Sequence, residues 1–291
     1  MQSLTRIKEL LEMAGHGPKK ALGQNFLIDQ NLINKLLDAS GVQEGDLVLE
    51  IGPGTGALTV GLLERGCRVV ACELDTDLAR VLRETLVEEY PGRLTIVEGD
   101  CLAGKKALNS EVVEALGEDE FCMVANLPYH AATPVMMTLM TRHAKCNGMF
   151  VTIQKEVVER FSAVGGGAGS KSYGSISVVA QCLGEVKMIA KLGSGCFWPS
   201  PGVESAMMGW RRDVGLVGGD DADWWVRLSE ISQLLFQSRR KKLGGVVKKI
   251  VGGGEIEWPE GVCGDDRIDG LSVGLVHGVC RAVEDANGGR G

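Results

Sequence analysis

Five short apolar runs alternate with amphipathic segments along the first half of the chain. The runs fall at residues 47–51, 68–72, 94–98, 121–125 and 148–153. Between them, apolar side chains recur at helical spacing in residues 57–65, 78–89, 105–117 and 134–142. Runs that are apolar throughout and bounded by glycine or charge are typical of strands buried on both faces of a parallel sheet. The pattern therefore predicts an α/β fold with an open, mostly parallel sheet.

Two helices are expected before the first of these runs. Residues 4–11 place their leucine and isoleucine side chains on one face, which predicts a short amphipathic helix. After the polar and aromatic loop of residues 23–27, either Asp29 or Asn31 is suited to cap a second helix that ends at Gly41. The first thirty residues are therefore interpreted as an arm that leads into the sheet.

The pattern is less clear after the fifth run. Residues 175–182 are rich in β-branched side chains and fit either a strand or a helix. Residues 186–192 and 206–210 are typical of antiparallel edge strands.

A glycine-rich stretch at residues 214–221 is interpreted as a linker between two domains. Residues 1–213, with the arm 1–30, are expected to form the sheet domain. Residues 214–291 then form a small helical domain, because apolar side chains recur at helical spacing directly after the linker.

A glycine turn follows the first apolar run and carries the clearest local signal. Gly52 and Gly54 let the backbone approach a ligand closely, and the helix that follows offers free N–H groups at its start. Glu73 ends the second run, about 20 residues later, where an acid is suited to accept hydrogen bonds from ribose hydroxyls. This pair indicates an adenosine-containing cofactor, and by itself it leaves an NAD-type dehydrogenase open.

The fourth apolar run stops abruptly at Asn126-Leu127-Pro128-Tyr129. Ligands of open α/β sheets bind at the carboxyl ends of the strands, which is where this sequence falls. Pro128 stiffens the turn and lacks an N–H, so nearby carbonyls can point outward as acceptors. Asp100 lies at the corresponding end of the third run, within reach of an adenine edge, although a simple turn explains it as well.

Composition and charge bear on the cellular compartment of the protein and on the kind of partner it binds. The nine cysteines form no CxxC pair and several lie in apolar runs, which favours reduced thiols, no metal site and a cytoplasmic protein. No apolar run reaches membrane-spanning length. The net charge of −7 argues weakly against a nucleic-acid partner, but residues 236–250 contain six basic and no acidic side chains. Four of these basic residues are adjacent: Arg239, Arg240, Lys241 and Lys242.

Taken together, the motifs resemble one family, the KsgA-type ribosomal RNA adenine N6-dimethyltransferases. The matching stretches, in family order, are GQNFL (23–27), EIGPGTG (50–56), ELD (73–75), GD (99–100), NLPY (126–129), QKEVVER (154–160), YG with SV (173–174, 177–178), FWPSPGVES (197–205) and FQSRRK (236–241). They extend over residues 16–243. The resemblance implies a Rossmann-like class I S-adenosylmethionine-dependent methyltransferase sheet with a small C-terminal helical domain.

The resemblance also implies roles for single residues in binding S-adenosylmethionine. Asn25 and Leu27 would close over the methionine end, beside the glycine turn of Gly52 and Gly54. Glu73 would hold the ribose hydroxyls and Asp100 the adenine amino group.

In the implied reaction, the Asn126 amide oxygen and the Leu127 carbonyl accept the hydrogens of the target N6 amine, and Asn126 also serves the cofactor. Accepting those hydrogens localises a lone pair that is otherwise delocalised into the ring. The target base must leave its stack, and Tyr129 and Phe197 would sandwich it. Without the resemblance, Phe197 is better explained as a core aromatic.

The implied substrate is small-subunit (16S) ribosomal RNA, methylated on two adjacent adenines near its 3′ end, during ribosome biogenesis. The basic residues 239–242 would bind phosphates, and the protein would be a monomer. Two alternatives remain: a large-subunit methyltransferase of the antibiotic-resistance type, and an assembly factor with little catalysis. Leu127 and the FWPSPGVES segment favour the small-subunit enzyme. His130 and the long glycine loop before Tyr173 depart from the family pattern.

Overall fold

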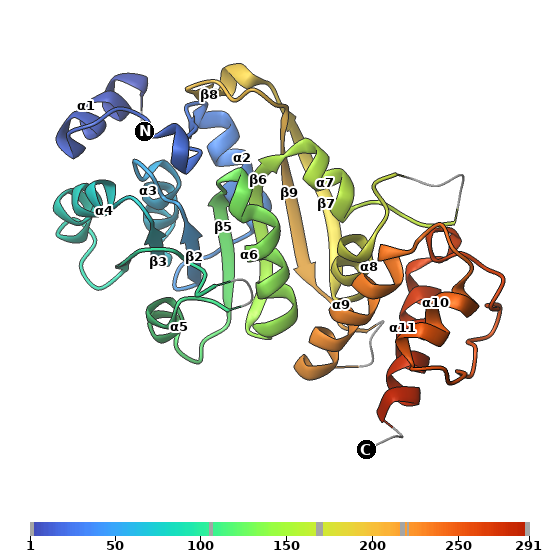
Figure 1. Ribbon diagram of the computed structural model, residues 1–291. Coiled ribbons are helices and arrows are strands. Elements are labelled where there is room, and N and C mark those ends of the chain that lie inside the picture. Colours follow the sequence, from blue (N-terminus) through green and yellow to red (C-terminus); the bar gives the residue numbers. More distant parts are fainter. Residues whose placement is uncertain (1–2, 105–106, 167–170, 216–218, 220, 289–291) are drawn as a thin grey trace. The chain divides into compact units, whose positions relative to one another are not determined.

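The computed structural model describes residues 3–104, 107–166, 171–215, 219 and 221–288. Its central feature is a seven-stranded sheet of order β4-β3-β2-β5-β6-β9-β7 (Figure 1). In that order the strands are Leu94–Glu98, Arg68–Glu73, Leu47–Ile51, Phe121–Asn126, Cys146–Gln154, Ser205–Arg212 and Gly184–Leu192. All five predicted core strands are present, in an order that reverses direction between β2 and β5. Such a reversal opens a crevice at the carboxyl ends of these two strands.

Strands β2 to β6 pair in parallel, and β9 pairs antiparallel with β6. The prediction of two antiparallel edge strands was therefore half right. Strand β7 lies at the edge of the sheet, but β9 lies between β6 and β7. The first six of the eight residues of β9 are buried, as expected for a strand in the interior of the sheet.

The central strands are largely apolar because helices cover both faces of the sheet. Val48, Cys122 and Val124 alternate along their strands and face one core cluster, which includes Leu36 and Leu62. These leucines come from helices α2 (Gln30–Ser40) and α3 (Ala57–Glu64). Helices α5 and α6 lie on the other side of the sheet in Figure 1.

Several predicted helices begin or end at a different residue. Helix α4 spans Thr76–Leu82 and continues as a π-helical segment, Arg83–Val87. Helix α5 is shorter than predicted, at Ser110–Leu116, because the Asn109 side chain caps it by accepting the Glu111 N–H at 2.9 Å. Residues 105–106, at the predicted start, lie outside the described residues.

Helix α6 spans Tyr129–Arg142, so the predicted start at Pro134 was wrong. The Pro128 carbonyl accepts the N–H groups of Ala131 and Ala132, at 3.0 and 3.2 Å, and starts the helix there. Pro134 lies within the helix and removes only the bond that its own N–H would have made to the preceding turn. Tyr129 is thereby fixed on the first turn of a helix.

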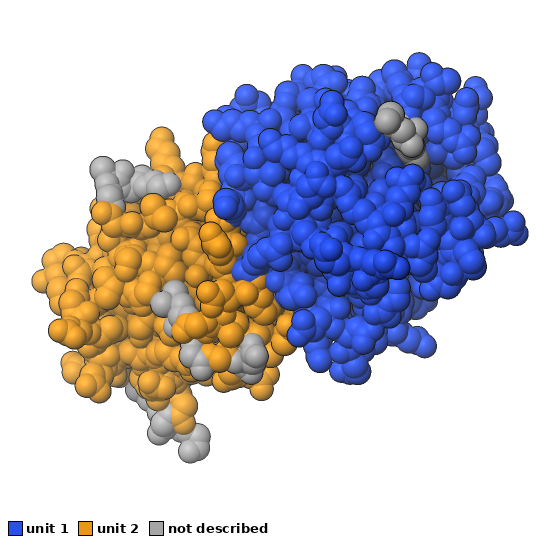
Figure 2. Space-filling view, turned by 180° about the vertical axis from the view of Figure 1, so that it is seen from behind, with its two compact units in different colours: residues 1–139, 145–158, 187–211 blue, residues 140–144, 159–186, 212–291 orange. Residues whose placement is uncertain are grey.

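The chain forms two compact units, which Figure 2 colours separately. The first comprises residues 1–139, 145–158 and 187–211, and the second comprises 140–144, 159–186 and 212–291. The second unit thus takes in residues that precede position 213, and the functional division at residues 213/214 stays a prediction. Of the proposed linker, residues 216–218 and 220 lie outside the described residues.

The second unit is helical. Residues 175–182 form helix α8, which resolves their ambiguity: the Ser177 hydroxyl accepts the Gly174 N–H at 3.2 Å and donates to the Arg160 carbonyl. This side chain caps the helix and ties it down, and β-branched residues then pack on its buried face. The other helices are α9 (Ala222–Gln237), α10 (Leu243–Ile250) and α11 (Val273–Gly288), and α8, α9 and α11 pack together.

The N-terminal arm belongs to the first unit. Helix α1 (Leu4–Ala14) buries Ile7, Leu10 and Leu11 in a small apolar cluster that also contains Phe26. Strand β1 (Phe26–Leu27) pairs antiparallel with β8 (Phe197–Trp198), so the arm is joined to a segment 170 residues further along. Helix α7 (Lys155–Phe161) follows β6 directly, and short 3-10 helices are at Lys20–Leu22, Ser194–Cys196 and Ile268–Gly270.

Two further expectations concern the cysteines and membrane-spanning segments. All nine cysteines are free thiols, as their scattered spacing predicted. Among the described residues, no helix has the length and apolar character needed to cross a membrane.

Candidate active site

A cavity in the first unit lies at the carboxyl ends of β2, β3 and β5, at the point where the strand order reverses. It brings together most of the residues that the sequence singled out for cofactor and substrate. Those that line it are Asn25, Leu27, Gly52, Gly54, Glu73, Asp100, Asn126, Leu127 and Tyr129. The arm, the glycine turn and the NLPY segment therefore meet around one space.

The glycine turn fits this space because two of its residues have no side chain. Gly54 has a φ of +59°, and a Cβ there would lie 2.9 Å from the Phe26 ring. Gly52 has a φ of +67°, and a Cβ there would lie 3.4 Å from Pro128. Both glycines are needed for conformation and for space, since larger residues rarely adopt such φ values. The turn is thereby packed between the arm on one side and NLPY on the other.

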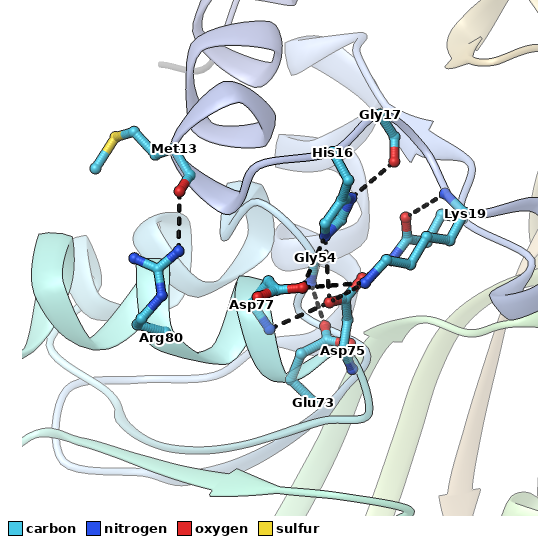
Figure 3. A network of polar contacts seen from close by, with 10 residues as sticks. Met13, His16, Gly17, Lys19, Gly54, Glu73, Asp75, Asp77 and Arg80 are labelled. Carbon is cyan, nitrogen blue, oxygen red and sulfur yellow. Dashed lines mark hydrogen bonds and ion pairs between the residues drawn. The ribbon is translucent and has the colours of Figure 1, made fainter.

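Glu73 is a buried carboxylate at the tip of β3. Its oxygens accept the Gly54 N–H at 2.8 Å and the Asp75 N–H at 2.9 Å (Figure 3). Burial raises its pKa, and the backbone hydrogen bonds oppose that shift. Each carboxylate oxygen has a second lone pair, so the group can still accept hydrogen bonds from a ligand.

Asp100 lies in the loop after β4 and lines the cavity at an exposed position. One carboxylate oxygen accepts the Leu102 N–H at 2.9 Å, and the Asp100 carbonyl accepts from the Asn109 side chain at 3.1 Å. These bonds fix the loop. The carboxylate keeps acceptor capacity toward the cavity, as an adenine amino group requires.

Asn126 joins the arm to the end of β5. Its Nδ2 donates to the Asn25 carbonyl at 2.8 Å. Since an amide has one nitrogen and one oxygen, this bond also orients Oδ1, which has no intramolecular partner among the described residues. The Leu127 N–H donates to the Thr152 carbonyl at 3.1 Å and so holds the NLPY backbone to β6. An oriented acceptor thus lies beside a fixed turn.

Tyr129 lines the cavity and is half-buried. Its hydroxyl lies 2.7 Å from the Ser205 hydroxyl at the start of β9, and burial raises its pKa. The structure does not bring Phe197 into the cavity. That side chain is 3% exposed and belongs to the core cluster beside Leu27, with which it pairs in β8 and β1. The sandwich of a base between Tyr129 and Phe197 therefore stays a prediction, and in this structure Phe197 packs as a core aromatic.

The basic residues 239–242 lie in the second unit, between α9 and α10. Arg239 is partly buried, and its Nη1 donates to the Lys171 and Tyr173 carbonyls at 3.0 and 3.4 Å. Lys242 forms an exposed ion pair with Asp265 at 2.8 Å. Arg240 and Lys241 are exposed and have no such partner among the described residues. The four basic side chains are thus not equivalent.

Two of the cavity residues that were not predicted as functional have unusual surroundings. Glu50 is 1% exposed and accepts the Thr59 hydroxyl hydrogen bond at 2.6 Å. The sequence feature that could have identified it is an acidic residue within an apolar strand, two positions before Gly52. Leu74 is 45% exposed although it is a large apolar residue. It follows Glu73 and lines the cavity, which makes it suited to contact a planar ring.

Comparison with known proteins agrees with this geometry. Residues 15–285 match the sequence model of a family described as ribosomal RNA adenine dimethylase. The chain belongs to this family. Over 249 residues it is 39% identical to the ribosomal RNA small subunit methyltransferase A of Leifsonia xyli subsp. xyli, and the alignment covers 84% of each chain.

Two solved structures support the fold assignment. A dimethyladenosine transferase from Plasmodium falciparum has a TM-score of 0.70 at 19% identity, over 90% of this chain and 98% of that one. The 23S rRNA methyltransferase ErmE has a TM-score of 0.61 at 21% identity, over 89% of this chain and 100% of that one. These similarities confirm the predicted Rossmann-like methyltransferase fold with its C-terminal helical region.

The cavity fits the adenosine cofactor expected for a dimethylase of this family. Glu73 and Asp100 supply acceptors for hydroxyl and amino hydrogens, and Leu74 supplies an apolar surface for a ring. Gly52 and Gly54 leave the backbone open where a Cβ would otherwise fill the space. The dehydrogenase alternative needs no NLPY segment, whereas in this family member the segment closes one side of the same cavity.

The buried Glu50 carboxyl predicts a specific pH dependence of stability. Burial raises its pKa to about 8, against the opposing hydrogen bond from Thr59. Between about pH 4.5 and pH 8 the unfolded protein therefore releases this proton while the folded protein keeps it, and the free energy of unfolding falls as pH rises. Glu50→Gln removes this penalty. Its stability relative to the wild type should increase from pH 5 to pH 8, reaching on the order of a few kcal/mol.

Denaturant unfolding of the ligand-free protein at a series of pH values measures this difference. Glu64→Gln, at an exposed position on α3, is the matched control and should show no comparable increase. A difference between Glu50→Gln and wild type that stays constant or shrinks toward pH 8 would contradict the assignment.

Proposed function

We propose that this chain is an S-adenosylmethionine-dependent ribosomal RNA adenine N6,N6-dimethyltransferase. Its substrate is small-subunit (16S) ribosomal RNA, in which it dimethylates two adjacent adenines near the 3′ end. The observation that carries the proposal is the Asn126 amide, whose nitrogen is held by Asn25 and whose oxygen remains to accept from a substrate. This acceptor lies in the same cavity as Glu73 and Asp100.

The residues of the cavity divide into two groups. Asn25, Leu27, Gly52, Gly54, Glu73 and Asp100 would hold the cofactor, which supplies an electrophilic methyl group. Asn126 and the Leu127 carbonyl would hold the target amine by accepting its hydrogens, which localises the nitrogen lone pair for attack. The protein's contribution is then positioning and electrostatic stabilisation of the charge that develops on the amine nitrogen.

Tyr129 is the side chain that would stack on the target base. Its ring lines the cavity, and its hydroxyl is held by Ser205, so one face is fixed for stacking. Stacking of a base on an aromatic ring contributes about 1–3 kcal/mol. Phe197 would supply a second face only after leaving the core, so we assign the stacking to Tyr129 alone.

The small-subunit substrate is supported by the relatives rather than by the fold. The first curated relatives are small-subunit methyltransferases at 35–39% identity. The fold by itself does not separate the alternatives, because ErmE, a 23S rRNA methyltransferase, shares it. Free thiols at all nine cysteines are compatible with the reducing cytoplasm, where we place the protein as a monomer that acts on immature small subunits.

Transfer of labelled methyl groups tests the proposed substrate. Undermethylated small ribosomal subunits and naked large-subunit RNA are offered separately, with labelled S-adenosylmethionine. Label is expected in adenines of the small-subunit RNA, as dimethyladenine. Label in the large-subunit RNA alone would favour the resistance-type alternative, and no label in either would favour an assembly factor.

Asn126→Ala tests the amine-holding role. The variant loses the acceptor for the amine, and its turnover is expected to fall by roughly 10²–10³-fold or more. Single-turnover methyl transfer with saturating cofactor measures this loss. Asn147→Ala, an exposed amide on β6, is the control. Near-normal turnover of Asn126→Ala would mean that another group holds the amine.

The unequal partners of the basic residues predict unequal effects on RNA binding. Arg240→Ala and Lys241→Ala should each weaken binding to small-subunit RNA and reduce the slope of log affinity against log salt by about 1. Arg239→Ala should instead lower the thermal unfolding midpoint, because its guanidinium holds two backbone carbonyls.

RNA affinity is measured by filter binding at several salt concentrations, with Lys35→Ala on α2 as the control. If Arg240→Ala and Lys241→Ala left the salt slope unchanged, these residues would not be phosphate contacts.

A further inference from the structure

A polar cluster beside the cavity has no role in the reaction described above. It joins the arm to the end of β3 (Figure 3). Lys19 Nζ lies 2.8 Å from one oxygen of Asp75 and 3.3 Å from Asp77. Gln24 Nε2 donates to the other oxygen of Asp75 at 2.8 Å, and His16 Nε2 lies 3.4 Å from Asp75. Asp75 is therefore surrounded by three residues of the arm.

The cluster is an ion-pair network with a composition that also occurs in metal sites. His16, Asp75 and Asp77 have ligand atoms within 4.8 Å of one another, as metal ligands do. However, the Lys19 ammonium already lies between the two carboxylates and supplies their positive charge. A cation in this place would have to displace it.

Loss of these partners would leave the Asp75 carboxylate buried without their compensating charge and hydrogen bonds. Its side chain is completely buried, and an isolated buried carboxylate is strongly unfavourable. Burial acts to raise its pKa, but the hydrogen bonds from Lys19 and Gln24 outweigh that effect and the pKa is lowered. The arm therefore compensates the burial of the carboxylate and holds its pKa below the ordinary value of an aspartate.

The cluster is connected directly to the cofactor-binding residues. The Asp75 N–H donates to Glu73, whose other oxygen holds the glycine turn at Gly54. Gln24 is followed by Asn25, whose carbonyl accepts from Asn126. The arm is thus attached at Asp75 on one side of the cavity and at Asn126 on the other.

We propose that Lys19 and Gln24 are positioning residues for the cofactor, because their bonds to Asp75 hold arm residues 23–27 over the cavity. This inference rests on the proposed function, since it takes S-adenosylmethionine as the ligand. Neither side chain touches the reacting atoms. Their loss leaves the arm detached for part of the time, and the apparent dissociation constant rises in proportion to the fraction of detached protein.

The test compares three variants of the full-length protein. Lys19→Met removes the ammonium, and Gln24→Leu removes, without a change of charge, both the bond to Asp75 and the bond that the Gln24 Oε1 accepts from the Lys19 N–H at 2.7 Å. Each should weaken binding of S-adenosylmethionine and of S-adenosylhomocysteine by on the order of tenfold in calorimetry. Lys20→Met is the matched control, because it removes the same charge at an adjacent exposed position, and it should bind like the wild type. Lys19→Arg should restore most of the affinity.

Two further measurements separate positioning from general instability. At saturating cofactor the kcat of Lys19→Met should lie near the wild-type value, while KM for the cofactor rises. In the ligand-free protein, hydrogen exchange of residues 22–27 should be faster in Lys19→Met and Gln24→Leu than in Lys20→Met, at similar thermal unfolding midpoints.

The outcomes distinguish this inference from the proposed function. If the wild type binds the cofactor and Lys19→Met and Gln24→Leu bind it as tightly as Lys20→Met, the positioning role is overturned and the proposed function stands. If the wild type itself binds neither compound, the proposed function fails and the inference fails with it.

Discussion

The buried carboxylate of Glu73 is the constraint on which the rest of the site depends. A charge in this position is unfavourable unless hydrogen bonds compensate it, and the chain supplies two backbone N–H groups, from Gly54 and Asp75. Those two bonds fix the glycine turn after β2 and Asp75, the second residue after β3. The ends of two neighbouring strands are thereby held in one geometry, which the proposed ribose-binding role of Glu73 requires.

The alternation of apolar runs and amphipathic segments was enough to predict the sheet, because strands covered on both faces leave a continuous apolar signal in the sequence. The residues at which helices begin were harder to predict from the sequence. Asn109 and the Pro128 carbonyl determine where α5 and α6 begin, and such caps depend on one hydrogen bond rather than on periodicity. The position of β9 between β6 and β7 also depends on tertiary pairing, which a local pattern does not contain.

The sequence placed a residue at the cavity where that residue ends a strand, as Glu73 and Asn126 do. The position of Phe197 could not be predicted in the same way. An aromatic side chain in a loop is equally suited to stack on a base and to pack in the core, and only the pairing of β8 with β1 places it in the core. The partners of Arg239 likewise are distant in the sequence, so its positive charge alone did not indicate the internal hydrogen bonds to the Lys171 and Tyr173 carbonyls.

The Asn126 side chain links the position of the arm to the proposed reaction. Its nitrogen is committed to the Asn25 carbonyl, and this commitment is what directs its oxygen toward the cavity. If the arm detached, the amide would be free to rotate and would present a donor as readily as an acceptor to the target amine. A donor would repel the amine hydrogens and would not localise its lone pair. In the proposed reaction, closure of the arm over the cofactor would therefore also set the polarity of the group that receives the substrate, and the two binding events would depend on one hydrogen bond.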